Sequence, residues 1–457
     1  MRIRLSLESR LALLFGALFG LPAVLLVPPV ATFDGPSHYF RALQVAEGRM
    51  RPEHYSDTAV GGALPRSHVD FVNALWRSYW ADRNLGTLTA WSALARETQG
   101  HPGSTRVEFT NTAVYSPANY AFQAAGMRVA SWVSPSPLAA HRAACLGNLA
   151  GYLALVVAAL ELLPRFRWGA LILATCPLSV IQAASVSADS VNFAVPLLVL
   201  AGAWRLRDGP ARAPAAGLAL VLSAGFVTAL LKPTALASLA CIALIPGLHF
   251  GSRRAKVACL GAFLACALAA WFAWNRANAN VDVARWFDPA HPPFSEQKAS
   301  FLANPLRFAR PFGYFLTRDL AAQWPHMFAD VGGWIPPGLH RALFWLSLVL
   351  LPGLASCGSW EGRSDWAWAG TMALQSLAVL FLTALALWVS MGTVGMDHVP
   401  GLTGRYLPFV ATGLAAAGAE AWHGGLPRLR RGLSWAALAA NGAGLTAILA
   451  SIASTTA

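Results

Sequence analysis

Charged residues are scarce in this sequence. Of its 457 residues, only 12% are Asp, Glu, Lys or Arg, whereas 56% are hydrophobic. Soluble globular proteins carry about 25% charged residues, so this chain has too little polar surface to cover itself in water. The net charge of +13 would suit a nucleic-acid-binding protein, but the basic residues are scattered over short loops, and we expect no nucleic-acid partner.

Cysteine is also scarce, and its placement argues against a zinc site or a disulfide framework. The cysteines lie within or at the ends of apolar segments, without the paired spacing of zinc ligands, and none lies in the large polar loop. We therefore predict that all six are small apolar packing residues: Cys145, Cys176, Cys241, Cys259, Cys266 and Cys357.

The motifs that bind soluble nucleotides are missing as well. The sequence has no Gly-x-Gly-x-x-Gly pattern, no Walker loop and no soluble α/β region able to hold a nucleotide sugar or ATP. An enzyme with this sequence that works on the outer face of a membrane would therefore need an activated donor that is carried by a lipid.

Long apolar runs recur along the whole chain. Each run of about 20 residues can cross about 30 Å of hydrocarbon. Because the bilayer core offers no water to backbone groups and the runs are too long for barrel strands, we predict helices. The predicted fold is all-α: a polytopic integral membrane protein with a single membrane domain, residues 1–457, and about eleven transmembrane helices. The expected spans are 11–30, 141–163, 168–186, 189–204, 214–231, 234–250, 257–274, 339–357, 367–390, 405–422 and 433–453.

The positive residues of the short loops predict the orientation. With the N-terminus in the cytoplasm, the inside segments hold fifteen Lys and Arg residues, and the short outside connections hold only Lys232 and Arg405. An excess of positive charge marks the cytoplasmic side. We therefore expect a cytoplasmic N-terminus.

Two long segments then lie outside the cytoplasm, residues 31–140 and 275–338, and we expect them to form a small helical cap. Residues 36–48 read as a short amphipathic helix that ends at a glycine and lies along the membrane interface. Residues 61–65, Gly-Gly-Ala-Leu-Pro, read as a turn.

Two aspartates follow or precede spans on the outer side. Asp34 comes directly after the first span and before Gly-Pro, where a carboxylate at the membrane surface can act as a general base. Asp189 lies between two spans, and an ionisable residue so close to hydrocarbon is a functional candidate. The alternative for each is a helix N-cap.

Two cations break the positive-inside pattern. Lys232, between two apolar runs, suits the phosphate of a lipid-linked substrate, and its alternative is snorkelling toward ordinary lipid phosphates. Arg405 can grip a phosphate through two parallel donors, and its alternative is an ion pair with Asp397.

Other outer-side polar residues carry weaker signals. His326, Asp330, Asp397 and His398 include metal-ligand types, but no local spacing supports a metal site, and a divalent metal stays only an alternative. Arg41, Arg66 and Arg106 are expected to be solvated.

Several short blocks resemble, in order, those of a bacterial predicted membrane-protein family, domain of unknown function 2142. The likeness runs from about residue 27 to 410. The blocks are Val27-Pro28-Pro29, Asp34 to Ala42, Glu47-Gly48, Gly61 to Pro65, Tyr115 to Tyr120, Ser187-Ala188-Asp189, Leu231-Lys232-Pro233 and Gly404 to Pro408. The family usually has Asp-Glu where this chain has Asp34-Gly35.

That family is similar to the membrane glycosyltransferases of the C fold, which take a sugar from a polyprenyl-phosphate carrier at the outer face. The resemblance implies that Asp34 is the catalytic acid/base and that Lys232 and Arg405 contact the donor phosphate. His38, Arg41, Asp189 and Tyr406 complete the expected substrate-binding set. It also implies a bacterial inner membrane, a lipid-linked sugar as donor and an envelope glycan or lipid as acceptor, with no certain cofactor.

The hypothesis from the sequence is therefore an inverting glycosyltransferase in contact with membrane lipids. A flippase or transporter for a lipid-linked glycan is an alternative, although the sequence shows neither inverted repeats nor charges near the bilayer midplane. A polysaccharide polymerase would use similar outer-face residues.

Overall fold

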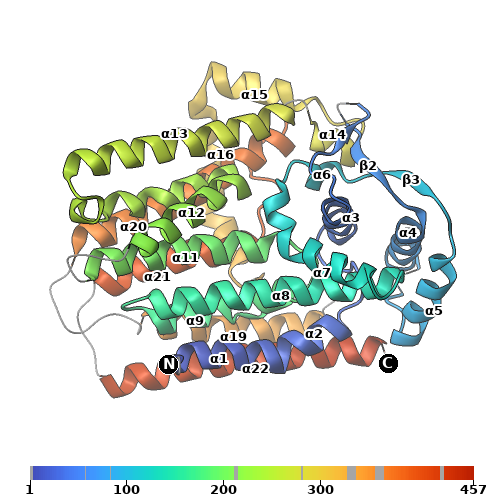
Figure 1. Ribbon diagram of the computed structural model, residues 1–457, viewed down its shortest axis with the longest axis horizontal. Coiled ribbons are helices and arrows are strands. Elements are labelled where there is room, and N and C mark those ends of the chain that lie inside the picture. Colours follow the sequence, from blue (N-terminus) through green and yellow to red (C-terminus); the bar gives the residue numbers. More distant parts are fainter. Residues whose placement is uncertain are drawn as a thin grey trace.

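A computed structural model describes residues 4–456 except 57, 83, 210–214, 279–280, 327–335, 356–364 and 422–426. In Figure 1, long helices lie side by side, and a smaller cap built largely from residues 35–131 covers one end of them. The bundle helices are α1 (Leu7–Phe15), η1 (Gly16–Gly20), α2 (Leu21–Leu26), α8 (Pro137–Leu162), α9 (Arg167–Ala174), α10 (Pro177–Ala183), α11 (Asp189–Asp208), α12 (Ala215–Leu231), η3 (Pro233–Leu244), η4 (Gly247–Phe250), α13 (Arg253–Ala277), α19 (Pro337–Ala355), α20 (Trp366–Met391), η7 (Gly404–Tyr406), α21 (Leu407–Ala421) and α22 (Pro427–Thr456).

The helical membrane character predicted from the sequence is confirmed. Five helices of the described chain are long and apolar enough to cross a membrane: Leu7–Leu26, Pro137–Leu162, Arg253–Ala277, Trp366–Met391 and Arg431–Thr456. Shorter apolar helices cover Ala215–Leu231, Pro233–Leu244 and Gly338–Leu351. Helical segments occupy all eleven expected positions, but crossing by all eleven stays a prediction.

The expected spans at 168–186 and 234–250 are not single α-helices. The span at 168–186 divides into α9 and α10 because Pro177 has no N–H and disfavours a helical residue before it. The carbonyls freed at this break find partners: Tyr152 Oη donates to Ala174 O at 2.7 Å, and Asn441 Nδ2 donates to Ile172 O at 2.7 Å. Such internal pairing is what a break within a bilayer requires. The span at 234–250 consists of the 3₁₀ segments η3 and η4.

The cap contains a small sheet as well as helices. The helices are α3 (Gly35–Ala46), α4 (Arg66–Trp80), α5 (Leu88–Gln99), α6 (Thr110–Ala113), η2 (Pro117–Tyr120) and α7 (Ala121–Ser131). The strands β1 (Glu53–His54), β2 (Val60–Pro65) and β3 (Ser104–Glu108) pair antiparallel in the order β1-β2-β3. The segment at 275–338 adds α14 (Val283–Phe287), α15 (Phe294–Ala303), η5 (Pro305–Phe308), α16 (Ala309–Tyr314), η6 (Phe315–Asp319) and α17 (Leu320–Gln323).

The turn expected at residues 61–65 is wrong, because these residues form the central strand β2. Its two glycines permit close packing rather than a reversal. A Cβ on Gly61 would collide with the carbonyl oxygen of Val107 in β3, and one on Gly62 would press on the amide of Gln44 in α3. A glycine pair therefore signals a crowded strand here.

Helix α3 ends near a glycine as expected, since Gly48 adopts a φ of 81° just beyond it. Its predicted place along the membrane interface is wrong. Ten of its twelve residues are buried, and α4, α7 and β2 surround it in Figure 1. Helix α3 therefore lies at the centre of the cap, and its buried apolar residues belong to the same core as those of the bundle.

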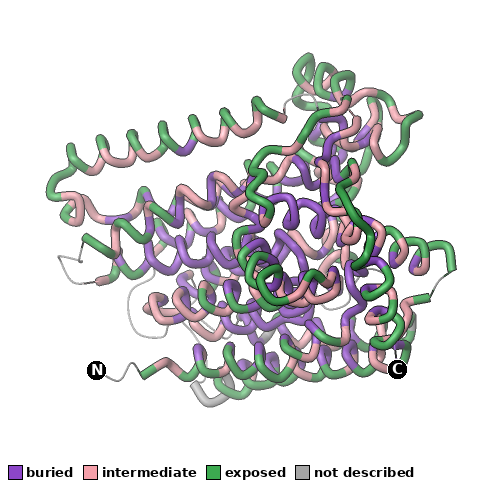
Figure 2. The backbone as a smooth tube through the Cα atoms, turned by 45° about the vertical axis from the view of Figure 1, so that its right-hand side comes forward, coloured by how far each residue is buried: buried purple, intermediate pink, exposed green. Residues whose placement is uncertain are grey.

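Burial is uneven across the bundle. Figure 2 shows the buried residues concentrated where the bundle meets the cap, and every residue of α10 and most of α11 are buried. By contrast, only Ala267 is buried in α13. Helix α11 is thus the central helix, and Asp189 is its first residue.

Of the cysteines, Cys145, Cys176 and Cys241 are buried as predicted, Cys266 is exposed on α13, and Cys357 lies outside the described residues.

Candidate functional site

Asp34 ends the turn that joins α2 to α3. Its φ of 54° lies in the left-handed region, which aspartate tolerates better than most residues. In the described structure the carboxylate does not cap α3: Oδ1 accepts a hydrogen bond from Asn111 Nδ2 at 2.9 Å, and Oδ2 pairs with Arg405 Nη1 at 3.0 Å. The helix-cap alternative for Asp34 is therefore wrong.

Side chains from α4 and α8 fix this turn. The ring of His141 accepts a hydrogen bond from the backbone N–H of Val30 at 3.2 Å, and Tyr79 Oη donates to Pro29 O at 3.0 Å. Arg142 donates to Val27 O at 3.2 Å, near the end of α2. Val30 itself has a φ of 56°, which is costly for a β-branched residue and must be stabilised by such contacts. The position of Asp34 is thus set by rigid helices.

Gly35 is required by the same turn. A Cβ at this position would collide with the carbonyl of Val30. The glutamate that the resemblance leads one to expect here could not be accommodated on this backbone. Asp34 is accordingly the carboxylate that this turn presents.

Asp189 and Lys232 form the second ion pair of the site. Lys232, which directly follows α12, donates from Nζ to Asp189 Oδ1 at 2.8 Å, and Gln182 Nε2 donates to Asp189 Oδ2 at 3.3 Å. The side chain of Lys232 is only 15% exposed, so it does not snorkel outward. The Asp189 side chain makes these contacts instead of capping α11. Both structural alternatives are therefore wrong.

Aromatic rings and charge stabilise the ammonium of Lys232. Its Nζ lies 5.4 Å from the ring centroid of Tyr115 and 4.8 Å from that of Tyr406, distances at which a cation is attracted to the ring face. Burial lowers the pKa of Lys232, but Asp189, through its charge and its hydrogen bond, together with Tyr115 and Tyr406 raises it more, so the pKa lies above its ordinary value. Lys232 is therefore a lasting positive charge at neutral pH.

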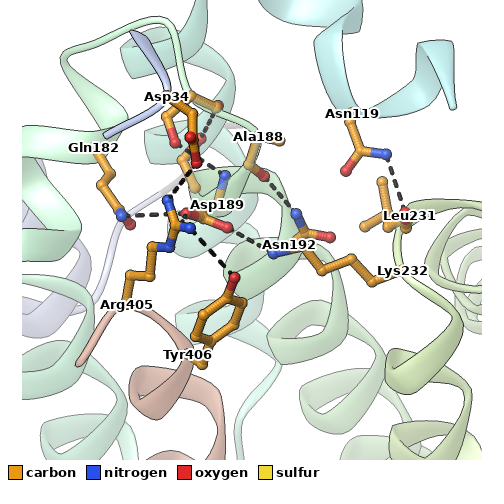
Figure 3. Close-up of polar contacts among 12 residues, drawn as sticks. Asp34, Asn119, Gln182, Ala188, Asp189, Asn192, Leu231, Lys232, Arg405 and Tyr406 are labelled. Carbon is orange, nitrogen blue, oxygen red and sulfur yellow. Dashed lines mark hydrogen bonds and ion pairs between the residues drawn. The ribbon is translucent and has the colours of Figure 1, made fainter. Parts of the chain in front are cut away.

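Arg405 joins the two ion pairs. Besides its contact with Asp34, its Nε lies 4.0 Å from Asp189 Oδ2, and Nη2 donates to Tyr406 Oη at 3.3 Å. Its Nε is buried without a hydrogen-bond partner among the described residues. The expected alternative, a pair with Asp397, is wrong, because Asp397 is half exposed and lies 3.6 Å from Arg310. Figure 3 shows Arg405 between Asp34, Asp189 and Tyr406. We call Asp34, Asp189, Lys232, Arg405 and Tyr406 the charged cluster.

Amide side chains fix the backbone that carries this cluster, and the sequence did not single them out. Asn119 Nδ2 donates to Leu231 O at 3.1 Å, just before Lys232, and Gln123 Nε2 donates to Ser187 O at 2.7 Å, just before Asp189. Asn119 falls within a block that matched the family pattern. Asn111, which orients Asp34, had no comparable signal.

A cleft adjoins the charged cluster and runs into the bundle. Part of it is open to the surroundings. Charged, polar and apolar side chains line it: Asp189, Asn192, Phe193, Pro196, Lys232, Thr234, Ala235, Val379, Thr383, Arg405, Tyr406, Pro408 and Phe409.

His38 and Arg41 are buried in the cap and are not among the described residues that line the cleft. His38 Nδ1 lies 2.8 Å from Tyr120 Oη, and burial lowers the pKa of His38 to about 4. Arg41 is fully buried, so its expected solvation is wrong; it donates to Gln44 Oε1 at 2.5 Å and to Met50 O at 2.9 Å. Their substrate contacts stay predictions. Arg66 and Arg106 are exposed as expected.

No cluster of three or more His, Cys, Asp or Glu side chains suited to a metal ion occurs in the described part of the chain. His326 packs edge-on against His340, and Asp330 lies outside the described residues.

A family model described as "Predicted membrane protein (DUF2142)" matches residues 13–412. The chain belongs to this family. The resemblance seen in the short sequence blocks is thereby confirmed. A search of curated proteins and a search of solved structures found no match.

The matched region of this DUF2142 protein contains the whole charged cluster and its cleft. It extends from within α1 to within α21, so α22 lies beyond it. The family description gives membrane character without an activity, so the chemistry must be argued from the site.

Proposed function

We propose that this protein is a membrane glycosyltransferase that moves a sugar from a polyprenyl-phosphate donor to a cell-envelope acceptor at the extracytoplasmic face of a bacterial inner membrane. The observation that carries the proposal is the meeting of Asp34, Lys232 and Arg405 in one cluster beside a cleft. These residues are far apart in the sequence and come from different elements, and the cap encloses them.

The two cations have donors to spare for a phosphate. Lys232 carries three N–H donors, of which one reaches Asp189, and Arg405 has its buried Nε without a hydrogen-bond partner in the described chain. An arginine and a lysine bind phosphate by complementary means, a planar fork and a point charge. A phosphate at this place would lie within reach of both side chains.

The carboxylate of Asp34 supplies the base. In the proposed step the acceptor oxygen forms a bond to the anomeric carbon while the bond from that carbon to the phosphate oxygen breaks. The acceptor proton passes to Asp34, and polyprenyl phosphate leaves with the bonding electron pair. It gains one negative charge, which Lys232 and Arg405 stabilise. Asn111 fixes the carboxylate for this transfer through its hydrogen bond to Oδ1.

The lining of the cleft favours chemistry on one face over transport. Below the charged cluster the described lining is largely apolar, with Phe193, Pro196, Val379 and Phe409. A transport path for a glycan would need polar groups along the whole width of the membrane. A flippase would therefore require a different route from the one this cleft offers.

The test is sugar transfer by the purified full-length protein with a labelled polyprenyl-phosphate sugar. We expect Asp34→Asn to lower the rate about 10²–10⁴-fold, the usual contribution of a general base. Asp397→Asn is the matched control, because Asp397 is an exposed aspartate outside the charged cluster. Full turnover by Asp34→Asn would remove Asp34 from the mechanism. Flipping of the lipid without transfer would replace the proposal by transport.

A further inference from the structure

The guanidinium of Arg41 is buried in the cap among neutral partners. Its hydrogen bonds in the described chain go to the side-chain oxygen of Gln44 and to the backbone oxygens of Met50 and Tyr115. Its Nε is buried without a hydrogen-bond partner among the described residues. A buried charge is costly unless an opposite charge compensates it. Because these partners carry no charge, ordinary packing does not account for an arginine at this place.

Two long-range hydrogen bonds hold the backbone on either side of Tyr115, in the loop between α6 and η2. Arg41 Nη2 donates to Tyr115 O at 3.3 Å, and Trp274 Nε1, near the end of α13, donates to Val114 O at 2.8 Å. The guanidinium of Arg41 in turn lies 5.8 Å from the ring centroid of Trp274, a distance at which a cation is attracted to the ring. A cap helix and a bundle helix therefore meet at this one loop residue.

The side chain of Tyr115 extends from this loop to the charged cluster. Lys232 Nζ lies 5.4 Å from its ring centroid, and the ring of His38 lies nearly parallel to it, at an angle of 5° and 6.1 Å between centroids. Tyr406 also contacts Lys232, at 4.8 Å, but it belongs to η7. Lys232 therefore has two aromatic neighbours on separate elements, and Arg41 holds the backbone of one of them.

We propose that Arg41 is a positioning residue, which together with Trp274 holds the ring of Tyr115 against Lys232. The inference rests on the proposed function, in which Lys232 stabilises the departing phosphate. Arg41 is fully buried and is not among the described residues that line the cleft, so it acts through Tyr115 rather than on the ligand.

Loss of either anchor should loosen the loop and move the ring of Tyr115 away from the ammonium. The ammonium then loses part of its aromatic surroundings and can turn its spare N–H donors away from the cleft. A role of Arg41 in packing alone would change the melting temperature and leave the surroundings of Lys232 as they are. The two roles therefore differ in what happens at Lys232.

The first experiment observes Lys232 by NMR in the full-length protein with isotope-labelled lysine Cε. The chain has three lysines: Lys232, Lys256 and Lys298. Protons over the face of an aromatic ring are shielded, so the Hε signal of Lys232 reports the place of Tyr115. We expect Arg41→Met and Trp274→Phe to move this signal toward its position in Tyr115→Leu, while the signals of the other two lysines stay unchanged. Trp274→Phe keeps the ring and removes only the N–H donor, so it decides the matter even where Arg41→Met does not fold. An unmoved Lys232 signal in the folded variants would overturn the proposal.

The second experiment measures binding of inorganic phosphate to the full-length protein in detergent. Arg41→Met and Tyr115→Leu should each weaken it about fivefold, as expected for loss of one cation–ring contact. The double variant should bind no more weakly than Tyr115→Leu alone, because Arg41 acts through that ring. The matched control is Arg41→Met combined with Tyr406→Leu, in which the two losses should multiply. Losses that multiply with Tyr115→Leu as well would show that Arg41 does not act through Tyr115.

The inference and the proposed function can fail separately, because the NMR measurement needs neither phosphate nor sugar. A Lys232 signal that moves as expected, in a protein that does not bind phosphate, keeps Arg41 as the residue that positions Tyr115 and removes the phosphate site. Sugar transfer by a protein whose Lys232 signal ignores Arg41→Met and Trp274→Phe does the reverse.

Discussion

Charged residues gather at both ends of α11, and the two groups differ in what surrounds them. At the first end lies the charged cluster. At the other end Arg165 pairs with Asp208 at 3.3 Å and with Glu420 at 3.2 Å, and Arg207 pairs with Asp365. We call these five residues the distal cluster. Helix α11 has 20 residues, so the clusters are about 30 Å apart, the thickness of a hydrocarbon core.

The difference lies in the space beside the ion pairs. The charged cluster borders a cleft lined by Asp189, Lys232 and Arg405, and none of the distal residues is among the residues that line this cleft. The distal pairs join the ends of α11 and α21 to the segment after α8. Ion pairs of similar length therefore serve helix packing at one end of the bundle and, as we propose, ligand binding at the other. Pairing alone does not identify a site.

The largest expected effect concerns the buried pair of Asp189 and Lys232. Lys232→Met should lower the free energy of unfolding by about 3–5 kcal/mol, because Asp189 then stays buried without its main partner. Adding Asp189→Asn should restore much of that loss, while phosphate binding stays weak. Thermal unfolding in detergent measures the first effect and phosphate binding the second. If the double variant recovered both the free energy of unfolding and phosphate binding, the pair would be purely structural, like the distal cluster.

The sequence revealed the charged members of the site because a bilayer leaves few places for charge. Lys232 and Arg405 stood out as cations on the side where positive residues are rare, and Asp189 stood out beside hydrocarbon. Their mutual contacts could not be predicted, since the contacting residues lie 43 residues apart for Asp189 and Lys232 and 371 residues apart for Asp34 and Arg405. The family resemblance and the helical membrane fold were likewise predicted.

The uncharged part of the site escaped prediction for a physical reason. Asn111 and Asn119 act on partners that a sequence does not display, a carboxylate 77 residues away and a backbone carbonyl. Arg41 was expected in solvent because it lies in a long outer loop. Its helix is instead covered by β2 and α7, and its guanidinium lies 5.8 Å from the ring of Trp274. The contacts of Asn111, Asn119 and Arg41 are set by tertiary packing, which the local sequence pattern does not show.

Arg405→Lys sharpens the comparison next. Lysine keeps the positive charge but lacks the planar fork and the buried Nε donor, so we expect sugar transfer to fall about 10²-fold or more. Arg165→Lys is the matched change in the distal cluster, where Asp208 and Glu420 stay within reach of a cation. Rates of transfer and melting temperatures of both variants decide the matter. If Arg405→Lys and Arg165→Lys transferred sugar at equal rates, the charged cluster would have no functional role that the distal cluster lacks.

A pH effect should distinguish the cap side of the molecule from the distal cluster, which consists of Arg, Asp and Glu. Burial lowers the pKa of His38 from 6.5 to about 4, so the unfolded chain binds a proton more readily than the folded chain. The free energy of unfolding should therefore fall as the pH drops from about 6.5 to 4, by at most about 3 kcal/mol from this residue, and then level off.

His68, whose pKa burial also lowers to about 4, should contribute in the same direction. The check is the melting temperature of the protein between pH 7.5 and 4. His38→Gln should flatten, but not abolish, the decline, because His68 remains. An unchanged slope in that variant would mean that His38 can become protonated without loss of folding.

The smallest expected effect is that of Asp208→Asn in the distal cluster. Asp208 lies 3.3 Å from Arg165 and 3.6 Å from Arg207, and each arginine keeps another carboxylate, Glu420 or Asp365. No cation is left alone, so the free energy of unfolding should fall by only about 0.5–1 kcal/mol. Sugar transfer should be unchanged, since Pro196, the cleft residue of α11 that lies nearest along the helix, is twelve residues from Asp208, or about 18 Å. Loss of transfer in a variant that unfolds at the normal temperature would show that the two ends of α11 are coupled, and the distal cluster would then belong to the functional machinery.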